Sequence, residues 1–175
     1  VSYVEAHGTG TSLGDPIELN SLASVLAEGR PSDRPCHVGS VKTNMGHLES
    51  AAGIAGLIKV VLALQHEEIP PHLHFRTLNP HITVDGFPLV IPVERTPWPA
   101  AERPRIAGVS SFGLTGTNAH VVVEEAPRER ERPAAIDRPR HVLALSARNE
   151  AGLRELVERW TDHLSAPDLS LADEC

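Results

Sequence analysis

Two histidines stand beside glycine-containing turns, where a ligand can reach their side chains. His7 precedes the run Gly-Thr-Gly-Thr, in which the glycines let a ligand approach the backbone and the threonines offer hydroxyl groups. His47 directly follows a glycine, and Lys42 lies five residues before it. Two histidines with a nearby lysine are suited to general acid–base chemistry and to stabilising a developing negative charge. On spacing alone, the simpler interpretation is that both histidines only cap turns.

The same turn and a second histidine pair raise two other kinds of site. A glycine-rich turn before a helix is typical of phosphate binding, but Asp15 places a carboxylate there, and the spacing matches neither the P-loop nor the dinucleotide fingerprint. His72 and His74 would point to the same side of a strand. A zinc site needs three or four ligands, and no third stands at a familiar spacing. We therefore expect no metal ion, and nucleotide binding stays a minor alternative.

Composition excludes further classes of protein. The 175 residues include 16 Lys+Arg and 23 Asp+Glu, a formal net charge of −7, and aromatic residues make up only 3%. Nucleic acid and anionic membrane surfaces are therefore not expected as partners, because both are bound largely through basic residues. Two cysteines outside any CxxC spacing indicate a reducing compartment, the cytoplasm. Because the chain starts at Val1, shows no leader and ends without a helix stop, we expect an excerpt of a longer polypeptide.

Two helices would place the histidines. The first is predicted directly after Gly14, with Asp15 as its N-cap and Glu18 completing a capping box. The second is predicted over residues 47–66 and is apolar on all sides except at Lys59. Its apolar run is shorter than the ~20 residues that a bilayer requires, so it is expected to be a buried core helix.

Strands and turns account for most of the remaining sequence. Residues 37–43 are predicted to form a strand that leads into a turn. Two further strands are expected at 106–112 and 119–125, joined by the tight turn 113–118. Frequent prolines predict an irregular path over residues 69–104.

The last part of the chain differs in composition. Residues 127–140 are rich in Pro, Arg and Glu and are predicted to form a linker. A strand over 141–145 and a helix over 147–164 with one apolar stripe follow. One strand and one helix cannot enclose a core, so this segment is expected to begin a further domain.

Three segments considered together resemble the C-terminal half of a β-ketoacyl synthase, specifically the ketosynthase domain of modular type I polyketide synthases. They are Val4–Glu18, with His-Gly-Thr-Gly-Thr; Gly39–Glu49, with Gly-His-Leu-Glu; and Ser110–His120. The resemblance implies an α/β fold, the C-terminal half of a thiolase-like layered α/β/α/β/α architecture, over residues 1–126. It also implies a linker at 127–140 and the start of a small α/β linker domain, between ketosynthase and acyltransferase, at 141–175.

The resemblance implies a decarboxylative Claisen condensation between thioesters on phosphopantetheine arms. His7 and His47 match the catalytic histidines, which promote decarboxylation and stabilise the enolate, and Lys42 matches the lysine that supports them. Thr9 and Thr11 match the threonines that bind the pantetheine arm. The loop formed by Phe112, Gly113 and Leu114 matches an acyl gate whose backbone N–H helps to form an oxyanion hole. No cofactor is expected to bind directly, because the phosphopantetheine is carried by acyl carrier protein.

The family's nucleophile is a cysteine of the N-terminal half, and neither Cys36 nor Cys175 matches it. We therefore expect this chain alone to be inactive. The expected partners are the N-terminal half of the ketosynthase, acyl carrier protein, the adjacent acyltransferase domain and a second copy in a homodimer. One alternative is a non-condensing, structural half-domain. Another, a hydrolase using Ser110 or Ser111, lacks the Gly-x-Ser-x-Gly turn.

Leu114 departs from the phenylalanine found in many relatives, which generates a prediction. Because the expected oxyanion donor is backbone, Leu114→Phe should preserve the chemistry and change the bulk of the gate. Acyl chain preference in the assembled enzyme should shift, measured as relative turnover of thioesters of different chain length. Complete loss of condensation would contradict this role.

Overall fold

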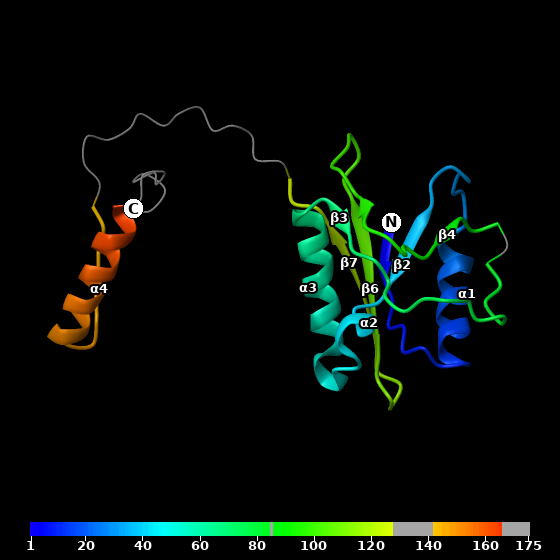
Figure 1. Cartoon of the computed structure of the whole chain (residues 1–175), viewed down its shortest axis with the longest axis horizontal. Helices are drawn as coiled ribbons and strands as arrows, with labels where there is room; N and C mark the ends of the chain where they lie inside the picture. Colours follow the sequence, from blue (N-terminus) through cyan, green and yellow to red (C-terminus); the bar gives the residue numbers. More distant parts are fainter. Residues whose placement is uncertain (85, 128–141, 166–175) are drawn as a thin grey trace. The chain divides into compact units, whose positions relative to one another are not determined.

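The computed structural model describes residues 1–84, 86–127 and 142–165, and it divides into two compact units, Val1–Ala126 and Pro127–Cys175. The first unit is built on a five-stranded sheet in the order β4-β2-β1-β6-β7 (Figure 1). Four strands are parallel and only β7 is antiparallel to its neighbour. Their bounds are β1 Tyr3–Glu5, β2 Cys36–Gly39, β4 Leu89–Val90, β6 Ile106–Phe112 and β7 Asn118–Glu124.

Successive residues of β1 face opposite sides of the sheet, and each side carries its own hydrophobic core. Tyr3 packs with residues of helix α3 (Ala52–Gln65), whereas Val4 packs with residues of helix α1 (Gly14–Leu26). Figure 1 shows the two helices on opposite sides of the strands. Both residues are fully buried, which explains why this strand lacks a polar face. The predicted mixed α/β layering is thus observed.

The prediction of one continuous helix over residues 47–66 is wrong at its start, because only Ala52–Gln65 form the α-helix. The structure has a four-residue helix α2 (Lys42–Met45), a 3-10 turn η1 (Glu49–Ala51) and then α3. Gly46 and Glu49 adopt positive φ angles of 76° and 51°, which a right-handed helix cannot contain. The predicted strand 37–43 accordingly ends at Gly39.

The capping expected for the first helix is also wrong. Helix α1 begins at Gly14, and Leu13 at its N-cap makes no side-chain capping bond. Asp15 and Glu18 instead accept hydrogen bonds from N–H groups of the preceding loop. The loop N–H groups thus bind the carboxylates that the capping prediction had assigned to N–H groups of the helix terminus. The spacing of residues in the sequence does not show that the loop lies this close.

Residues 69–104 are mostly irregular, as predicted, but include three short strands that form two pairings. Strands β3 (Glu68–Ile69) and β5 (Thr96–Pro97) form a separate antiparallel pair. Strand β4 extends the main sheet beside β2. Trp98 follows β5 and packs on Tyr3 with 5.9 Å between ring centroids, so the irregular segment closes the core on the α3 side.

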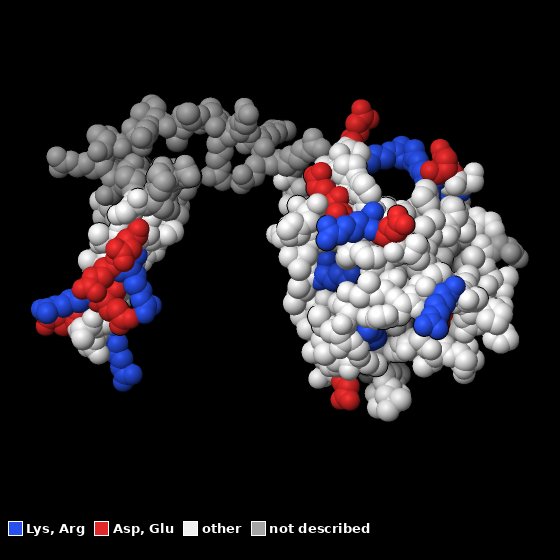
Figure 2. All heavy atoms as spheres, in the orientation of Figure 1, with Lys and Arg blue, Asp and Glu red and all other residues white. Residues whose placement is uncertain are grey.

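The second unit contains helix α4 (Glu150–Leu164), three residues shorter at its start than predicted because Asn149 caps it by accepting a hydrogen bond from Gly152 N at 2.8 Å. The predicted strand over 141–145 is not formed: His141 lies outside the described residues and 142–145 have no strand partner. The linker predicted at 127–140 falls outside them except for Pro127. Figure 2 shows acidic and basic side chains interspersed along α4, among them the 2.7 Å pair Arg154–Glu150.

Helix α3 is covered on one side only within the described residues. Its buried side includes Val60 and Ala63, while large apolar side chains remain exposed on the other side, namely Ile54, Ile58, Val61 and Leu62. Lys59, the single charge that the sequence shows in this helix, is buried and pairs with the Glu5 carboxylate at 2.8 Å. No described helix is long and apolar enough to span a membrane.

The buried pair generates a stability prediction. Lys59→Met removes the cation and leaves the Glu5 carboxylate unpaired in the core, so it should lower the free energy of unfolding by about 3–5 kcal/mol. The double variant Glu5→Gln/Lys59→Met removes both charges together and leaves the Tyr3 hydroxyl to accept from the new amide, so it should recover most of that loss. Urea unfolding followed by circular dichroism measures both values. Equal loss in the single and double variants would contradict the charge-burial explanation.

Candidate active site

The loop that follows β1 carries His7 and depends on glycine at two positions. Gly8 and Gly10 have positive φ angles of 49° and 75°, which favour glycine. A Cβ atom on Gly8 would also lie 2.8 Å from Ser40 Cβ, at the end of β2. The loop can therefore approach the neighbouring strand only because position 8 lacks a side chain.

Two carboxylates of helix α1 hold this loop in place by accepting hydrogen bonds from its backbone N–H groups. Glu18, which is 6% exposed, accepts hydrogen bonds from His7 N at 2.8 Å and Gly8 N at 3.0 Å. Asp15 accepts one from Gly10 N at 3.1 Å. Burial raises the pKa of Glu18, and the two backbone hydrogen bonds oppose that rise. The backbone position of His7 is thus set by a buried acid eleven residues further along the chain.

The His7 side chain lies between His47 and Phe112. Its ring centroid is 5.3 Å from each of the other two, and the two imidazoles are nearly perpendicular at 82°. Phe112 N donates a hydrogen bond to His7 Nδ1 at 3.4 Å. A nitrogen that accepts this bond carries no proton, so neutral His7 presents N–H at Nε2.

His47 is brought beside His7, as a shared site requires, but it does not begin a helix. It lies in the exposed segment between α2 and η1, and its Nδ1 accepts a hydrogen bond from Glu49 N at 3.0 Å. The helix predicted to begin at His47 therefore does not act on this histidine through its N-terminus. The Glu49 N–H orients the His47 ring by donating to its Nδ1. As in His7, the proton of the neutral imidazole is therefore on Nε2.

Electrostatics at the site disfavour a proton on His7. Burial lowers the pKa of His7, and the neighbouring Lys42 cation lowers it further, against the opposing influence of the Asp15 carboxylate. Burial also lowers the pKa of Lys42, against the opposing influence of Glu5 and Glu18. Lys42 thus acts on His7 as a neighbouring cation without a hydrogen bond to it.

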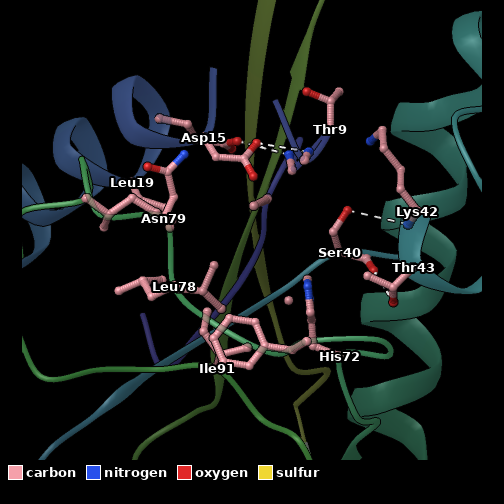
Figure 3. Close-up of a pocket in the computed structure, with 18 of the residues that line it drawn as sticks. Thr9, Asp15, Leu19, Ser40, Lys42, Thr43, His72, Leu78, Asn79 and Ile91 are labelled. Atoms are coloured by element: carbon pink, nitrogen blue, oxygen red, sulfur yellow. Dashed lines mark hydrogen bonds between the residues drawn. The ribbon is translucent and has the colours of Figure 1, made fainter. Parts of the chain in front are cut away.

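A pocket of about 650 Å³ lies beside the glycine-rich turn and Lys42 (Figure 3), and the residues that line it do not include His7, His47 or Phe112. Thr9 and Lys42 lie at one side of it, and Leu78, Ile91 and His72 lie at the other. The two threonines of the glycine-rich turn differ in their surroundings. Thr9 lines the pocket, whereas the Thr11 hydroxyl accepts a hydrogen bond from Gly14 N at 3.1 Å and is absent from the lining.

The turn after β6 begins beside His7, and its tip is exposed to solvent. Phe112 is half-buried, while Gly113 and Leu114 are exposed, Leu114 completely. Gly113 N donates to Thr117 O at 2.7 Å, which closes the turn. The Leu114 N–H has no acceptor among the described residues and is free to bind a ligand oxygen.

Sequence reasoning overlooked two residues near the site. His72 was considered only as a metal ligand, yet its ring lines the pocket and its buried Nδ1 has no hydrogen-bond partner among the described residues. Residues 72–74 form a turn with φ of 62° at His74, so they are not on a strand. Glu5 was not singled out at all. Its position next to apolar residues, together with the single charge of Lys59 in an apolar helix, was the available signal. Across 1–84, 86–127 and 142–165, no three His, Cys, Asp or Glu side chains gather as metal ligands.

Two further candidates carry no chemistry in this geometry. The Cys36 thiol is buried in β2, and burial raises its pKa, so the reactive thiolate is disfavoured. Ser110 Oγ lies 3.0 Å from His120 Nδ1, but Ser110 is buried within β6 and only 5% exposed. Ser110 and His120 line a second pocket of about 530 Å³, so burial of Ser110 within the strand is the argument against it as a nucleophile.

Sequence profiles of two family descriptions match the chain. "Beta-ketoacyl synthase, C-terminal domain" matches residues 1–76, and "Ketoacyl-synthetase C-terminal extension" matches residues 79–175. A phenolphthiocerol/phthiocerol polyketide synthase of Mycobacterium tuberculosis is 49% identical over 99% of this chain. An erythronolide synthase of Saccharopolyspora erythraea is 51% identical over 99% of it. The chain spans only 9% and 6% of the length of these two relatives.

Solved structures give the same similarity. The ketosynthase from module 6 of the bacillaene synthase of Bacillus subtilis superposes with a TM-score of 0.70 at 43% identity, over 99% of this chain and 30% of that one. An oxazolomycin ketosynthase domain of Streptomyces albus gives a TM-score of 0.70 at 41% identity, over 95% and 30%. The predicted resemblance and its thiolase-like fold class are thus confirmed.

The charges around His7 generate a pH prediction. His7 should titrate below the usual value of about 6.5, and Lys42→Met should raise its pKa because one neighbouring cation is lost. Lys42→Arg keeps the charge and is the matched control. Because the folded-state pKa is the lower one, the associated stability is complete above about pH 6.5 and is lost as the pH falls through the folded value. NMR titration of the His7 ring measures the pKa; no change in Lys42→Met would contradict the assignment.

Proposed function

The chain belongs to the β-ketoacyl synthases, as a C-terminal segment of a modular polyketide synthase ketosynthase, and from this premise we propose that it supplies the two histidines of a decarboxylative condensation. The substrates would be an acyl thioester and a malonyl-type extender on acyl carrier protein. The observation that carries the proposal is the orientation of the two imidazoles. A backbone N–H donates to Nδ1 of each ring, so each neutral ring presents its proton at Nε2.

Two Nε2–H donors on perpendicular rings are suited to an enolate. When a malonyl-type thioester loses CO₂, the electron pair of the broken C–C bond moves into an enolate, whose negative charge lies largely on the thioester oxygen. Hydrogen bonds from His7 and His47 to that oxygen strengthen as the charge develops and lower the barrier. The enolate carbon then attacks the acyl thioester, forms the new C–C bond and releases the enzyme thiolate.

Charge near the pair supports the same roles. The Lys42 cation disfavours protonation of His7, so the imidazole stays a neutral hydrogen-bond donor. Lys42 also places a positive charge beside the oxygen on which the enolate charge develops. We propose Lys42 as the residue that supports the histidines electrostatically.

The pocket and the turn after β6 support the remaining roles. Thr9 faces the pocket and is proposed to bind the pantetheine arm; Thr11, whose hydroxyl is engaged in the loop, is proposed to hold Thr9 in place, with 3.4 Å between the two hydroxyl oxygens. The free Leu114 N–H is proposed as the oxyanion donor, and Phe112 and Gly113 place it.

The nucleophilic cysteine would come from the N-terminal half of the ketosynthase, so the chain alone is proposed to be inactive. Acyl carrier protein, carrying phosphopantetheine, the adjacent acyltransferase domain and a second copy in a homodimer are the further proposed partners, in the cytoplasm. No directly bound cofactor is proposed.

The test uses the complete polyketide synthase polypeptide that contains this chain. His7→Ala and His47→Ala should each lower extender decarboxylation by roughly 10²–10⁴-fold, because each removes one donor. Loading of the enzyme from an acyl thioester, followed by intact-protein mass spectrometry, should persist. His66→Ala, at the exposed end of α3, is the matched control and should decarboxylate at the unaltered rate.

Two outcomes would overturn the proposal. One is unaltered decarboxylation in both histidine variants, which would favour a non-condensing domain. The other is an acyl adduct on Cys36 in the isolated chain, located by peptide mapping. That adduct would show that the chain has its own nucleophile.

A further inference from the structure

The Glu5 carboxylate is buried at the point where β1, β2 and α3 meet. It is 1% exposed and lies two residues before His7. Its Oε2 accepts hydrogen bonds from Tyr3 Oη at 2.6 Å and from Lys59 Nζ at 2.8 Å. Its Oε1 accepts the backbone N–H of Val41. All of these partners are themselves buried, so water does not screen the interactions.

Two glycines provide the space that this group occupies. A Cβ atom on Gly56, in α3, would lie 3.0 Å from Glu5 Cγ. A Cβ atom on Gly39, in β2, would lie 2.9 Å from Tyr3 Oη and 3.3 Å from Lys59 Nζ. The surrounding elements are therefore shaped around the carboxylate and its partners.

Val41 directly precedes the short helix that carries Lys42. Helix α2 has only four residues and no side-chain cap, and a helix of one turn is not stable on its own. From Asn44 to Ala51 the chain is exposed, so few packing contacts hold this segment. Leu73 N also donates to Thr43 Oγ1 at 3.3 Å, in a partly buried contact. The bond from Val41 N to Glu5 is the fully buried attachment at the start of the segment that also carries His47.

We propose that Glu5 is a positioning residue for Lys42 and His47, acting through its hydrogen bond from Val41 N and itself held by Lys59 and Tyr3. Glu5 also ends the strand that leads to His7, so one carboxylate ties both halves of the histidine pair to the α3 core. Lys59 balances the charge and Tyr3 fixes the second oxygen, which leaves Oε1 directed at Val41. The role in condensation rests on the proposed function; the structural attachment does not.

The first test compares two variants in the complete polyketide synthase polypeptide. Glu5→Gln/Lys59→Met keeps an acceptor for Val41 N and leaves the Tyr3 hydroxyl to accept from the new amide, whereas Tyr3→Phe/Glu5→Leu/Lys59→Met has a wholly apolar group and no acceptor for Val41 N. The Leu variant should lose roughly 100-fold in the kcat of condensation, the cost of a small misplacement of catalytic groups. The Gln variant should restore most of that loss, and loading of the nucleophile should be alike in both.

The second test removes the donor and leaves Glu5, Lys59 and Tyr3 intact. Val41 has a φ of −61°, which suits proline, and Val41→Pro has no N–H. Val41→Ala retains the N–H and is the matched control. Hydrogen–deuterium exchange of the peptide covering residues 42–48 should rise at least several-fold in Val41→Pro relative to Val41→Ala. The peptide covering helix α1 is the internal control for general destabilisation, and its exchange should change much less.

The exchange readout does not depend on catalysis, so it separates the two proposals. If the unsubstituted polypeptide fails to condense but exchange rises only in Val41→Pro, the proposed function falls and the attachment stands. Equal exchange in the two Val41 variants, or equal condensation in the folded Gln and Leu variants, would overturn the positioning role. If the Leu variant does not fold, the Val41 pair decides the question.

Discussion

A carboxylate buried without water must find partners for both of its oxygens, and Glu5 finds them on three elements. Lys59 comes from α3, Tyr3 from β1 and the Val41 N–H from the segment after β2. Each partner is required because an unpaired charge in the core costs several kcal/mol. The need to pair both oxygens of Glu5 therefore fixes how the sheet, helix α3 and the segment that begins at Val41 lie relative to one another. That is a stricter constraint than apolar packing, which tolerates small shifts.

Glu18 applies the same principle on the other face of the sheet. This residue of α1 is buried, and its carboxylate accepts hydrogen bonds from the N–H groups of His7 and Gly8. Both site segments are loops after parallel strands, where backbone N–H groups would otherwise lack partners. Buried acids from two layers therefore hold the two loops that carry the histidines. The site is precise because carboxylates fixed in the core support it, although the loops themselves are exposed.

The sequence predicted the motifs well and the local geometry less well. Asp15 and Glu18 stand at capping spacing, but the loop N–H groups that they actually bind come from residues that the fold brings close. The apolar run around Lys59 was correctly predicted to be helical, but the helix is buried on one side only in this unit. Its start was placed at His47 because a positive φ at Glu49 cannot be recognised from composition. His7 beside His47 followed from the family resemblance; the two Nδ1 hydrogen bonds could be seen only in coordinates.

The exposed side of α3 shows why this unit depends on more surface than it contains. The helix is apolar on all sides, and the sheet covers only the side that holds Val60. Ile54, Ile58 and Leu62 leave a contiguous apolar side facing outward, next to the segment that carries His47. Burying these side chains would stabilise the unit, because apolar area removed from water contributes roughly 25 cal/mol per Å². The surface that covers this side would therefore stabilise the same helix that supplies Lys59 to Glu5.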